Sequence, residues 1–428
     1  MGNILKNEID CTCEDFLFDI YGARSKPCTA AMKTLLTAVV TGGSTLVKGL
    51  SSSLRKDGGK SESKRTQEMV SRWLMNYDFS EKLNDHLLGL ASSLVSDRTT
   101  LAIDFSDISK EFGGAGMEGM ENGWDGSRHC VAMGHDFVCV SVVGADFRDA
   151  QPVYVKLGKG RHDKEDLLRV AIDEIMSKTG GRGWMVCDRG MDDAKFIYRM
   201  KRDARTVVVR VKDMKRDVFG NGKDIDETLN AAKFGSVMLN TYRGARKAEV
   251  RYAVGTMQYC ADPRSKLAET HATRLLVVES RFDGKSIYMY VVCPGEVVDD
   301  PHLAWAFAVR AAQAYCDRWQ IEASFQTVKR EFSLEKARVR KFKRLENIFS
   351  LCMLAYVFAT RYLRLSKRFG RIVKVLGDNV SELALKTHSL LAGIRDLYGE
   401  HRVRFITGRP RKAPVSDGRQ LQFAFAEA

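Results

Sequence analysis

Several features that mark common protein classes are missing from this sequence. Its ten cysteines include no C-x-x-C pair, and only Cys11 and Cys13 lie close together. This pattern argues against a disulfide framework and against a zinc finger. It favours reduced thiols, as in a cytoplasm.

Membrane and export signals are missing as well. The N-terminus has no basic-then-apolar signal peptide, because Glu8, Asp10, Glu14 and Asp15 interrupt the first residues. The apolar stretches are shorter than the roughly 20 residues that a membrane span requires. The sequence therefore predicts a cytoplasmic protein without a membrane partner.

Motifs of several enzyme classes are also absent. The glycine-rich stretch 113–126, which we expect to form a loop, contains no Gly-Lys-Ser/Thr of a phosphate-binding loop, and no G-x-S-x-G occurs. His129 and His135 flank Cys130, but loop histidines are more often unliganded, so a zinc site is disfavoured there.

Positive charge is present in excess. The chain of 428 residues has 68 Lys and Arg against 54 Asp and Glu, a net charge of +14. Such a balance favours a polyanionic partner, DNA or RNA first. Eight cations lie between residues 329 and 344, opposed only by Glu331 and Glu335, and three of them are Arg338, Arg340 and Lys341. This run is either a solvated face or a track for a phosphate backbone.

The order of apolar patterns predicts the domain organisation. Residues 1–98 are expected to form a helical domain whose cations favour DNA binding over a purely packing role, and residues 99–204 the first half of an α/β core. Five strand-like segments without a long helix predict a β-rich insertion at 205–300. Residues 301–365 return to helix as the second half of the core, and 366–428 form a basic tail.

Two short apolar runs each end at an acid. Leu101-Ala102-Ile103 precedes Asp104, and Trp184 to Cys187 precedes Asp188. Buried strands with this pattern project an acid at their end. Asp107 follows three residues after Asp104 and is expected to cap the next turn, and for Asp192 a helix-capping role and a DNA-side role remain open.

One predicted helix carries an unusual polar stripe. Tyr315, Arg318, Glu322 and Lys329 are spaced 3, 4 and 7 residues apart. At 100° per residue they lie within about 60° of one another. A stripe that packs into a core would be apolar, and a single i,i+4 surface pair explains only two of the four residues.

This stripe resembles the Y-x2-R-x3-E-x6-K signature of a large family of bacterial insertion-sequence transposases of the DDE class. The run from Asp188 to Asp192 is similar to the D-R-x-x-D motif of the same family, and Asp104 corresponds to its first acid. The resemblance implies a ribonuclease-H-like core interrupted by a β-rich insertion between the second and third acids.

The resemblance also implies a reaction and a site. Asp104, Asp188 and Glu322 would hold two divalent ions, Mg²⁺ or in its place Mn²⁺, because hard cations prefer carboxylate oxygens. The partners would be double-stranded DNA, as element ends and as target, and a second copy of the chain in the DNA complex. Arg318, Lys329, Tyr315 and Arg189 would contact DNA. Two alternatives remain open: a related nuclease that cuts without joining, and a domesticated DNA-binding copy without catalysis.

Overall fold

The computed structural model describes residues 2–21, 27–53, 60–110, 116–125, 129–161, 164–241, 244–260, 270–376 and 387–396. Within these ranges ten strands form one mixed sheet with the order β2-β3-β1-β5-β6-β10-β9-β8-β7, and β4 pairs with the same edge of β3 as β2, farther along that strand. The strands span Thr100–Lys110 (β1), Glu121–Asp125 (β2), Cys130–Val143 (β3), Gln151–Leu157 (β4), Trp184–Cys187 (β5), Val207–Arg210 (β6), Gly235–Thr241 (β7), Gly244–Cys260 (β8), Thr270–Phe282 (β9) and Lys285–Val292 (β10).

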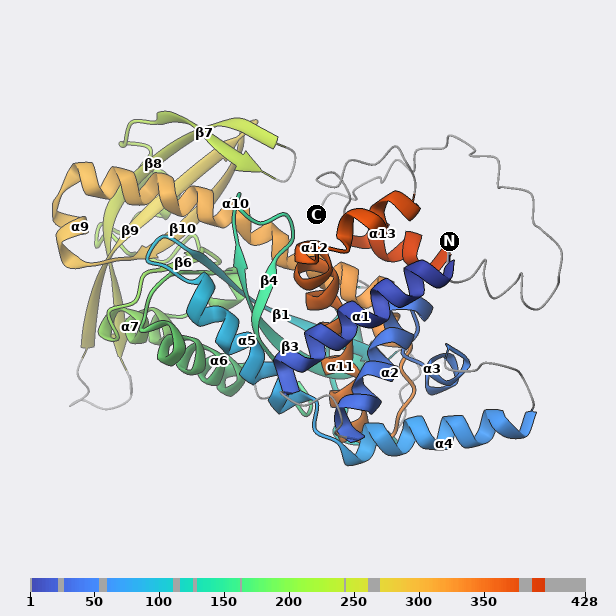
Figure 1. Cartoon of the computed structure of the whole chain (residues 1–428). Helices are drawn as coiled ribbons and strands as arrows, with labels where there is room; N and C mark the ends of the chain where they lie inside the picture. Colours follow the sequence, from blue (N-terminus) through green and yellow to red (C-terminus); the bar gives the residue numbers. More distant parts are fainter. Residues whose placement is uncertain are drawn as a thin grey trace.

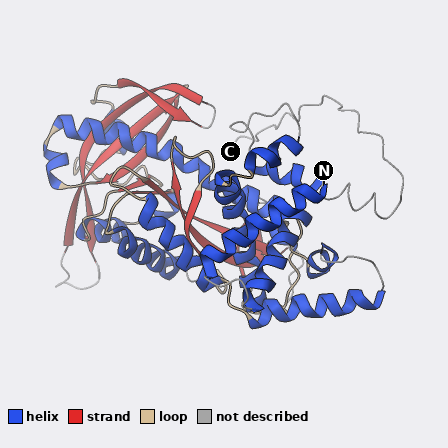
Figure 2. Ribbon diagram, viewed as in Figure 1, coloured by secondary structure: helices blue, strands red, loops and turns tan. Residues whose placement is uncertain are grey.

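Helices cover both faces of this sheet, which gives an α/β architecture in layers (Figure 2). The helices of the first half of the chain are α1 (Gly2–Tyr21), α2 (Pro27–Gly42), α3 (Val47–Ser53), α4 (Lys60–Asn76), α5 (Ser80–Leu94), α6 (Lys164–Thr179), α7 (Ala194–Arg202) and α8 (Ile225–Leu229). Those of the second half are α9 (Gly295–Asp299), α10 (Pro301–Glu331), α11 (Phe342–Val357), α12 (Leu363–Leu365) and α13 (Phe369–Leu376).

The period-two alternation of the central strands decides which helices cover which face. Leu101, Ile103 and Cys187 point into a core shared with α5, α6 and α7. Val186 and Val208 point to the opposite face, where the first half of α10 packs. Because neighbouring residues of a strand face opposite sides, a residue directly after Ile103 or Cys187 faces α10.

The strands between residues 205 and 300 extend the central sheet. β10 pairs antiparallel with β6, and β9, β8 and β7 follow outward. Figure 1 shows α10 lying along these strands and then continuing toward the centre of the molecule. Asp283-Gly284, predicted to be a hairpin turn, joins β9 to β10, with Asp283 at φ 48° and Gly284 at φ 78°.

The N-terminal helices share their core with the C-terminal ones. Side chains of α1, α2, α4 and α5 pack in one cluster with α11 and the second half of α10. In Figure 1, α1 and α2 (blue) lie beside α11 and α12 (orange), although the two pairs of helices come from opposite ends of the sequence. Residues on both sides of the predicted domain boundary at residue 98 therefore belong to one continuous core.

Two predictions from the sequence need correction. The stretch 113–126 is not all loop, because β2 lies within it and pairs with β3 at the sheet edge. The apolar stretches are also longer than expected: Phe342–Leu365 is helical and apolar enough to cross a membrane. However, 78% of its most apolar window is buried inside the molecule, as in the core helix of a soluble fold.

Candidate active site

Two neighbouring parallel strands bring Asp104 and Asp188 together. β1 and β5 pair in parallel with Ile103 opposite Cys187, so the two acids follow aligned residues. Both face α10, by the alternation described above. β5 ends at Cys187, whereas β1 continues to Lys110 because β3 still pairs with it there.

Helix α10 places the residues of the polar stripe next to Asp104 and Asp188. The Arg318 guanidinium donates to Asp104 Oδ2 at 2.8 Å and to Glu322 Oε1, so one cation bridges the first and third acids. Its side chain is buried, and it lies 5.3 Å from the centre of the Tyr315 ring. Tyr315, which was expected to contact DNA, is only 9% exposed, so little of its ring is accessible.

The three acids act on one another electrostatically. Burial raises the pKa of Asp104 to about 7; Arg318 opposes this shift, whereas Glu322 and Asp188 add to it. Burial would lower the pKa of Arg318, but the Tyr315 hydroxyl and all three carboxylates keep that pKa above its usual value. The site thus gathers negative charge that requires a cation, and in this structure the cation is Arg318.

The ligand chemistry of the site fits a hard divalent ion. Carboxylate oxygens are the donors that Mg²⁺ and Mn²⁺ prefer. As the side chains stand, however, no group of three His, Cys, Asp or Glu in the described part of the chain is arranged to hold a metal. Arg318 lies between Asp104 and Glu322, so an ion held by both carboxylates would take the place of its guanidinium.

The fourth residue of the stripe is also paired with carboxylates. Lys329 Nζ lies 3.0 Å from Asp107 Oδ1 and 3.3 Å from Glu335 Oε1. Asp107 is part of β1 and does not cap a turn, contrary to the expectation from sequence. The ion pair between Lys329 and Asp107 is thus a second connection between α10 and β1, three residues beyond Asp104.

Asp192 does not cap the helix that follows it, which corrects one of the two roles considered for it. Its fully shielded side chain accepts from Lys212 N at 2.7 Å and pairs with Arg216, which ties η1 (Arg189–Met191) to the segment after β6. The cap of α7 is Asp193, which accepts from Phe196 N at 2.9 Å. Arg189 itself is exposed beside Asp188.

The predicted basic track begins at a turn that is fixed by a buried lysine. Lys110 Nζ donates to Glu335 O at 2.7 Å and to Ala337 O at 2.8 Å, which holds η2 (Leu334–Lys336) against the end of β1. Arg338, Arg340 and Lys341 follow and are all exposed. Three cations thus lie on the surface, close in sequence to the signature helix.

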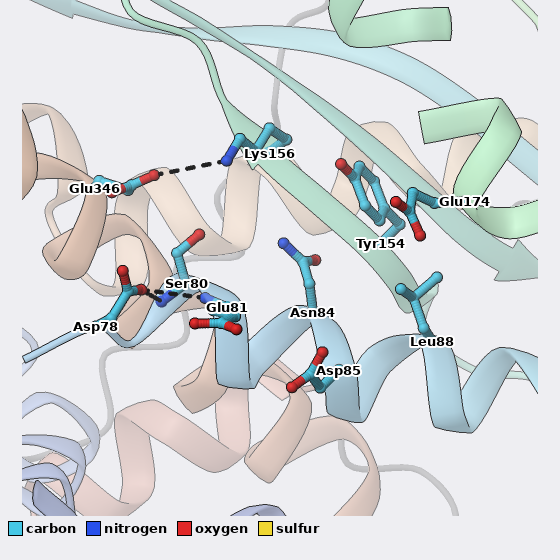
Figure 3. A pocket seen from close by; sticks show the side chains of 10 residues that line it. All are labelled: Asp78, Ser80, Glu81, Asn84, Asp85, Leu88, Tyr154, Lys156, Glu174 and Glu346. Atoms are coloured by element: carbon cyan, nitrogen blue, oxygen red, sulfur yellow. Dashed lines mark hydrogen bonds and ion pairs between the residues drawn. The ribbon is translucent and has the colours of Figure 1, made fainter. Parts of the chain in front are cut away.

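A cavity of about 260 Å³ lies elsewhere, between α5, β4 and α6 (Figure 3). Figure 3 shows Lys156 pairing with Glu346 at its rim, while Glu81, Asp85 and Glu174 line the hollow. An acidic lining repels phosphate, so the cavity does not favour a polyanion.

The site belongs to a defined class: a mixed α/β sheet that presents two acids where the parallel pairing of β1 with β5 ends, opposite a helix that contributes the third. Residues 95–358 match the family model of the transposase DDE domain, well over half of the chain. The protein therefore belongs to the DDE-domain transposase family. No curated protein sequence matches it.

Proposed function

We propose that this protein is an insertion-sequence DNA transposase of the family with the Y-x2-R-x3-E-x6-K signature, built on a ribonuclease-H-like core. Asp104, Asp188 and Glu322 are its acidic triad and its metal ligands. The observation that carries the proposal is the grouping of these three acids: Arg318 pairs with both Asp104 and Glu322, and Asp188 follows the residue that lies opposite Ile103 in the parallel pairing of β1 with β5.

The reaction is cleavage at the element ends and transfer of the freed strand into target DNA. Divalent ions, Mg²⁺ with Mn²⁺ as a substitute, would activate the attacking water or 3′-hydroxyl and stabilise the leaving oxygen. The triad supplies the oxygen ligands. Arg318 and Lys329 bind phosphates near the cut. Arg318 exchanges a carboxylate partner for a phosphate oxygen, and Lys329 donates the third N–H of its ammonium while Asp107 and Glu335 hold the other two.

Further contacts position the duplex. Exposed Arg338, Arg340 and Lys341 follow the phosphate backbone, and Arg189 reaches DNA next to Asp188. Removal of the three charges of the track is expected to weaken binding and to lower its salt slope, by up to about 0.9 for each phosphate that is no longer neutralised. An unchanged slope would remove the track from the proposal.

The N-terminal helices are proposed to recognise the element ends. α4 carries exposed Lys64, Arg65 and Arg72. Deleting residues 1–98 would test this role poorly, since the deletion also opens the shared core. Replacing the three cations by alanine leaves the core intact and is expected to reduce end binding; unchanged binding would defeat this role.

The remaining parts of the proposal concern assembly and location. Two element ends react together, so the DNA complex holds two copies of the chain, and the protein acts in the cytoplasm. Band shifts with one and two labelled ends measure the first point: a complex that never contains two ends would contradict it.

The decisive experiment is strand cleavage of a DNA fragment that carries the flanking element ends. Wild type, Glu322→Gln and the control Glu174→Gln, an exposed residue of α6, are compared with Mg²⁺ and with EDTA. We expect Mg²⁺-dependent nicking by wild type and control, its loss in Glu322→Gln, and end binding by all three. Joined products distinguish a transposase from a nuclease. Wild type that binds ends but never cuts with Mg²⁺ or Mn²⁺ is a DNA-binding protein without catalysis.

A further inference from the structure

Asp107 shares its carboxylate between two cations. Arg161 Nη2 lies 2.9 Å from Oδ2, and Lys329 Nζ lies 3.0 Å from Oδ1. Each oxygen of one carboxylate thus holds a different side chain, one from the turn after β4 and one from α10. Neither Asp107 nor Arg161 belongs to the acidic triad or to the signature stripe.

The Arg161 side chain is built into the protein. It is 4% exposed, and its guanidinium also contacts Ser109 Oγ at 3.0 Å and lies 3.8 Å from Asp136 Oδ1. Two glycines make room for it: a Cβ at Gly123 would lie 2.3 Å from Arg161 Cδ, and one at Gly134 2.6 Å from Nη2. A buried guanidinium held in this way fixes the position of Asp107.

The Lys329 ammonium is held but still reachable. Its side chain is 20% exposed, and its two carboxylate partners engage two of its three donors. A lysine side chain on its own is a flexible point charge with much rotamer entropy to lose on binding. Asp107 removes that freedom in advance, and Arg161 offsets part of the negative charge that Asp107 and Glu335 place beside Lys329.

We propose that Arg161 and Asp107 are positioning residues that hold the Lys329 ammonium ready for a DNA phosphate. This inference rests on the proposed function, in which Lys329 binds a phosphate near the cut. It adds two residues to the DNA-binding machinery that act only through Lys329 and touch neither the DNA nor the metal.

The test measures binding of a fluorescein-labelled duplex from the flanking element end, in EDTA, over a series of salt concentrations. Asp107→Asn keeps the shape of the side chain and removes its charge. A role of charge alone predicts tighter binding of this variant, because a repelling anion is removed. A positioning role predicts binding weaker by about tenfold, the value of one charge-assisted hydrogen bond.

A double-mutant cycle shows whether the effect passes through Lys329. Asp107→Asn and Arg161→Lys are each measured in wild type and in Lys329→Ala. We expect both to weaken binding in wild type and to add almost nothing in Lys329→Ala. Arg251→Lys is the matched control: Arg251 pairs with buried Glu279 on β8 and β9, is 3% exposed, and should change stability without changing DNA affinity.

The outcomes separate this inference from the proposed function. Unchanged or tighter binding by Asp107→Asn overturns the inference, as does a full additional loss in the Lys329→Ala background. A Lys329→Ala variant that binds normally overturns it too, and in all three cases Mg²⁺-dependent cleavage by wild type still stands. If Arg161→Lys does not fold, the isosteric Asp107→Asn variant alone decides the test.

Discussion

The Gln320 side-chain amide makes two hydrogen bonds to the main chain of Gly144. Gly144 N donates to Oε1 at 3.2 Å, and Nε2 donates to the Gly144 carbonyl at 3.1 Å. Gly144 directly follows β3 and has φ 140°, a conformation that L side chains rarely adopt and that glycine permits. This clamp joins α10 to the sheet two residues before Glu322.

Removal of the clamp should affect both stability and catalysis. Gln320→Ala removes two neutral hydrogen bonds, each worth about 1 kcal/mol, so we expect unfolding to require about 1–2 kcal/mol less. The rate of strand cleavage should fall while end binding changes little, because Glu322 loses its fixed register. Urea denaturation and single-turnover cleavage measure the two effects, with exposed Gln326→Ala on the same helix as control. A normal rate in a destabilised variant would show that the clamp only supports the fold.

The buried carboxyl of Asp317 should make stability depend on pH. Burial raises its pKa from 3.8 to about 6, although a hydrogen bond from Gln313 and the charge of Arg310 oppose the shift. Since the folded state holds the proton more tightly, this group stabilises the fold below about pH 4 and loses that contribution as pH rises to about 6.

Asp317→Asn should therefore stabilise the protein at pH 8 by up to about 3 kcal/mol and hardly at all at pH 4. Gln313 can still donate to the new amide oxygen. Urea denaturation at a series of pH values measures the difference from wild type, and Asp97→Asn in an exposed turn is the control. A difference that stays constant from pH 4 to pH 8 would contradict the assignment.

Asn347 connects α11 to the joint between α4 and α5. It is fully buried, donates to Leu74 O at 2.9 Å and Tyr77 O at 2.8 Å, and accepts from Phe79 N at 3.0 Å. Asn347→Ala leaves three main-chain groups without this partner, and we expect a loss of about 3 kcal/mol or more. Thermal or urea unfolding measures this loss of stability, with Asn221→Ala in an exposed loop as the control. A loss smaller than that of the control would refute the structural role of Asn347.

The cysteines should differ sharply in reactivity. Cys11 and Cys130 are exposed, whereas Cys139 and Cys187 are buried, and burial raises the pKa of Cys139 to about 12. Brief treatment with iodoacetamide should label Cys11 and Cys130, and Cys187 only after unfolding, because the thiolate is the reactive form. Peptide mass spectrometry reads out the sites. Rapid native labelling of Cys187 would mean that the strand before Asp188 opens.

Much of the fold was predictable from local patterns. All five strands expected between residues 205 and 300 are present, because alternating β-branched runs and the Asp283-Gly284 turn are local signals. β2 was missed because its Gly123 indicates a turn; the glycine instead makes space for Arg161, which lies 38 residues further along the chain. A contact across such a distance leaves no periodic signal in the sequence.

The sequence by itself determined which residues share the stripe of α10 and that each of two acids directly follows a buried apolar run, because helical and strand periods are local properties of the chain. That β1 continues past Asp104 to Lys110 was not predictable, because its pairing with β3 sets that length. Only the tertiary structure decided that Arg318 bridges Asp104 and Glu322, and that Asp107 joins Lys329 to Arg161. These contacts depend on the parallel register of β1 with β5 and on the packing of α10 across the sheet. Pairings between distant segments are set by the burial of whole faces, which no single stretch of sequence specifies.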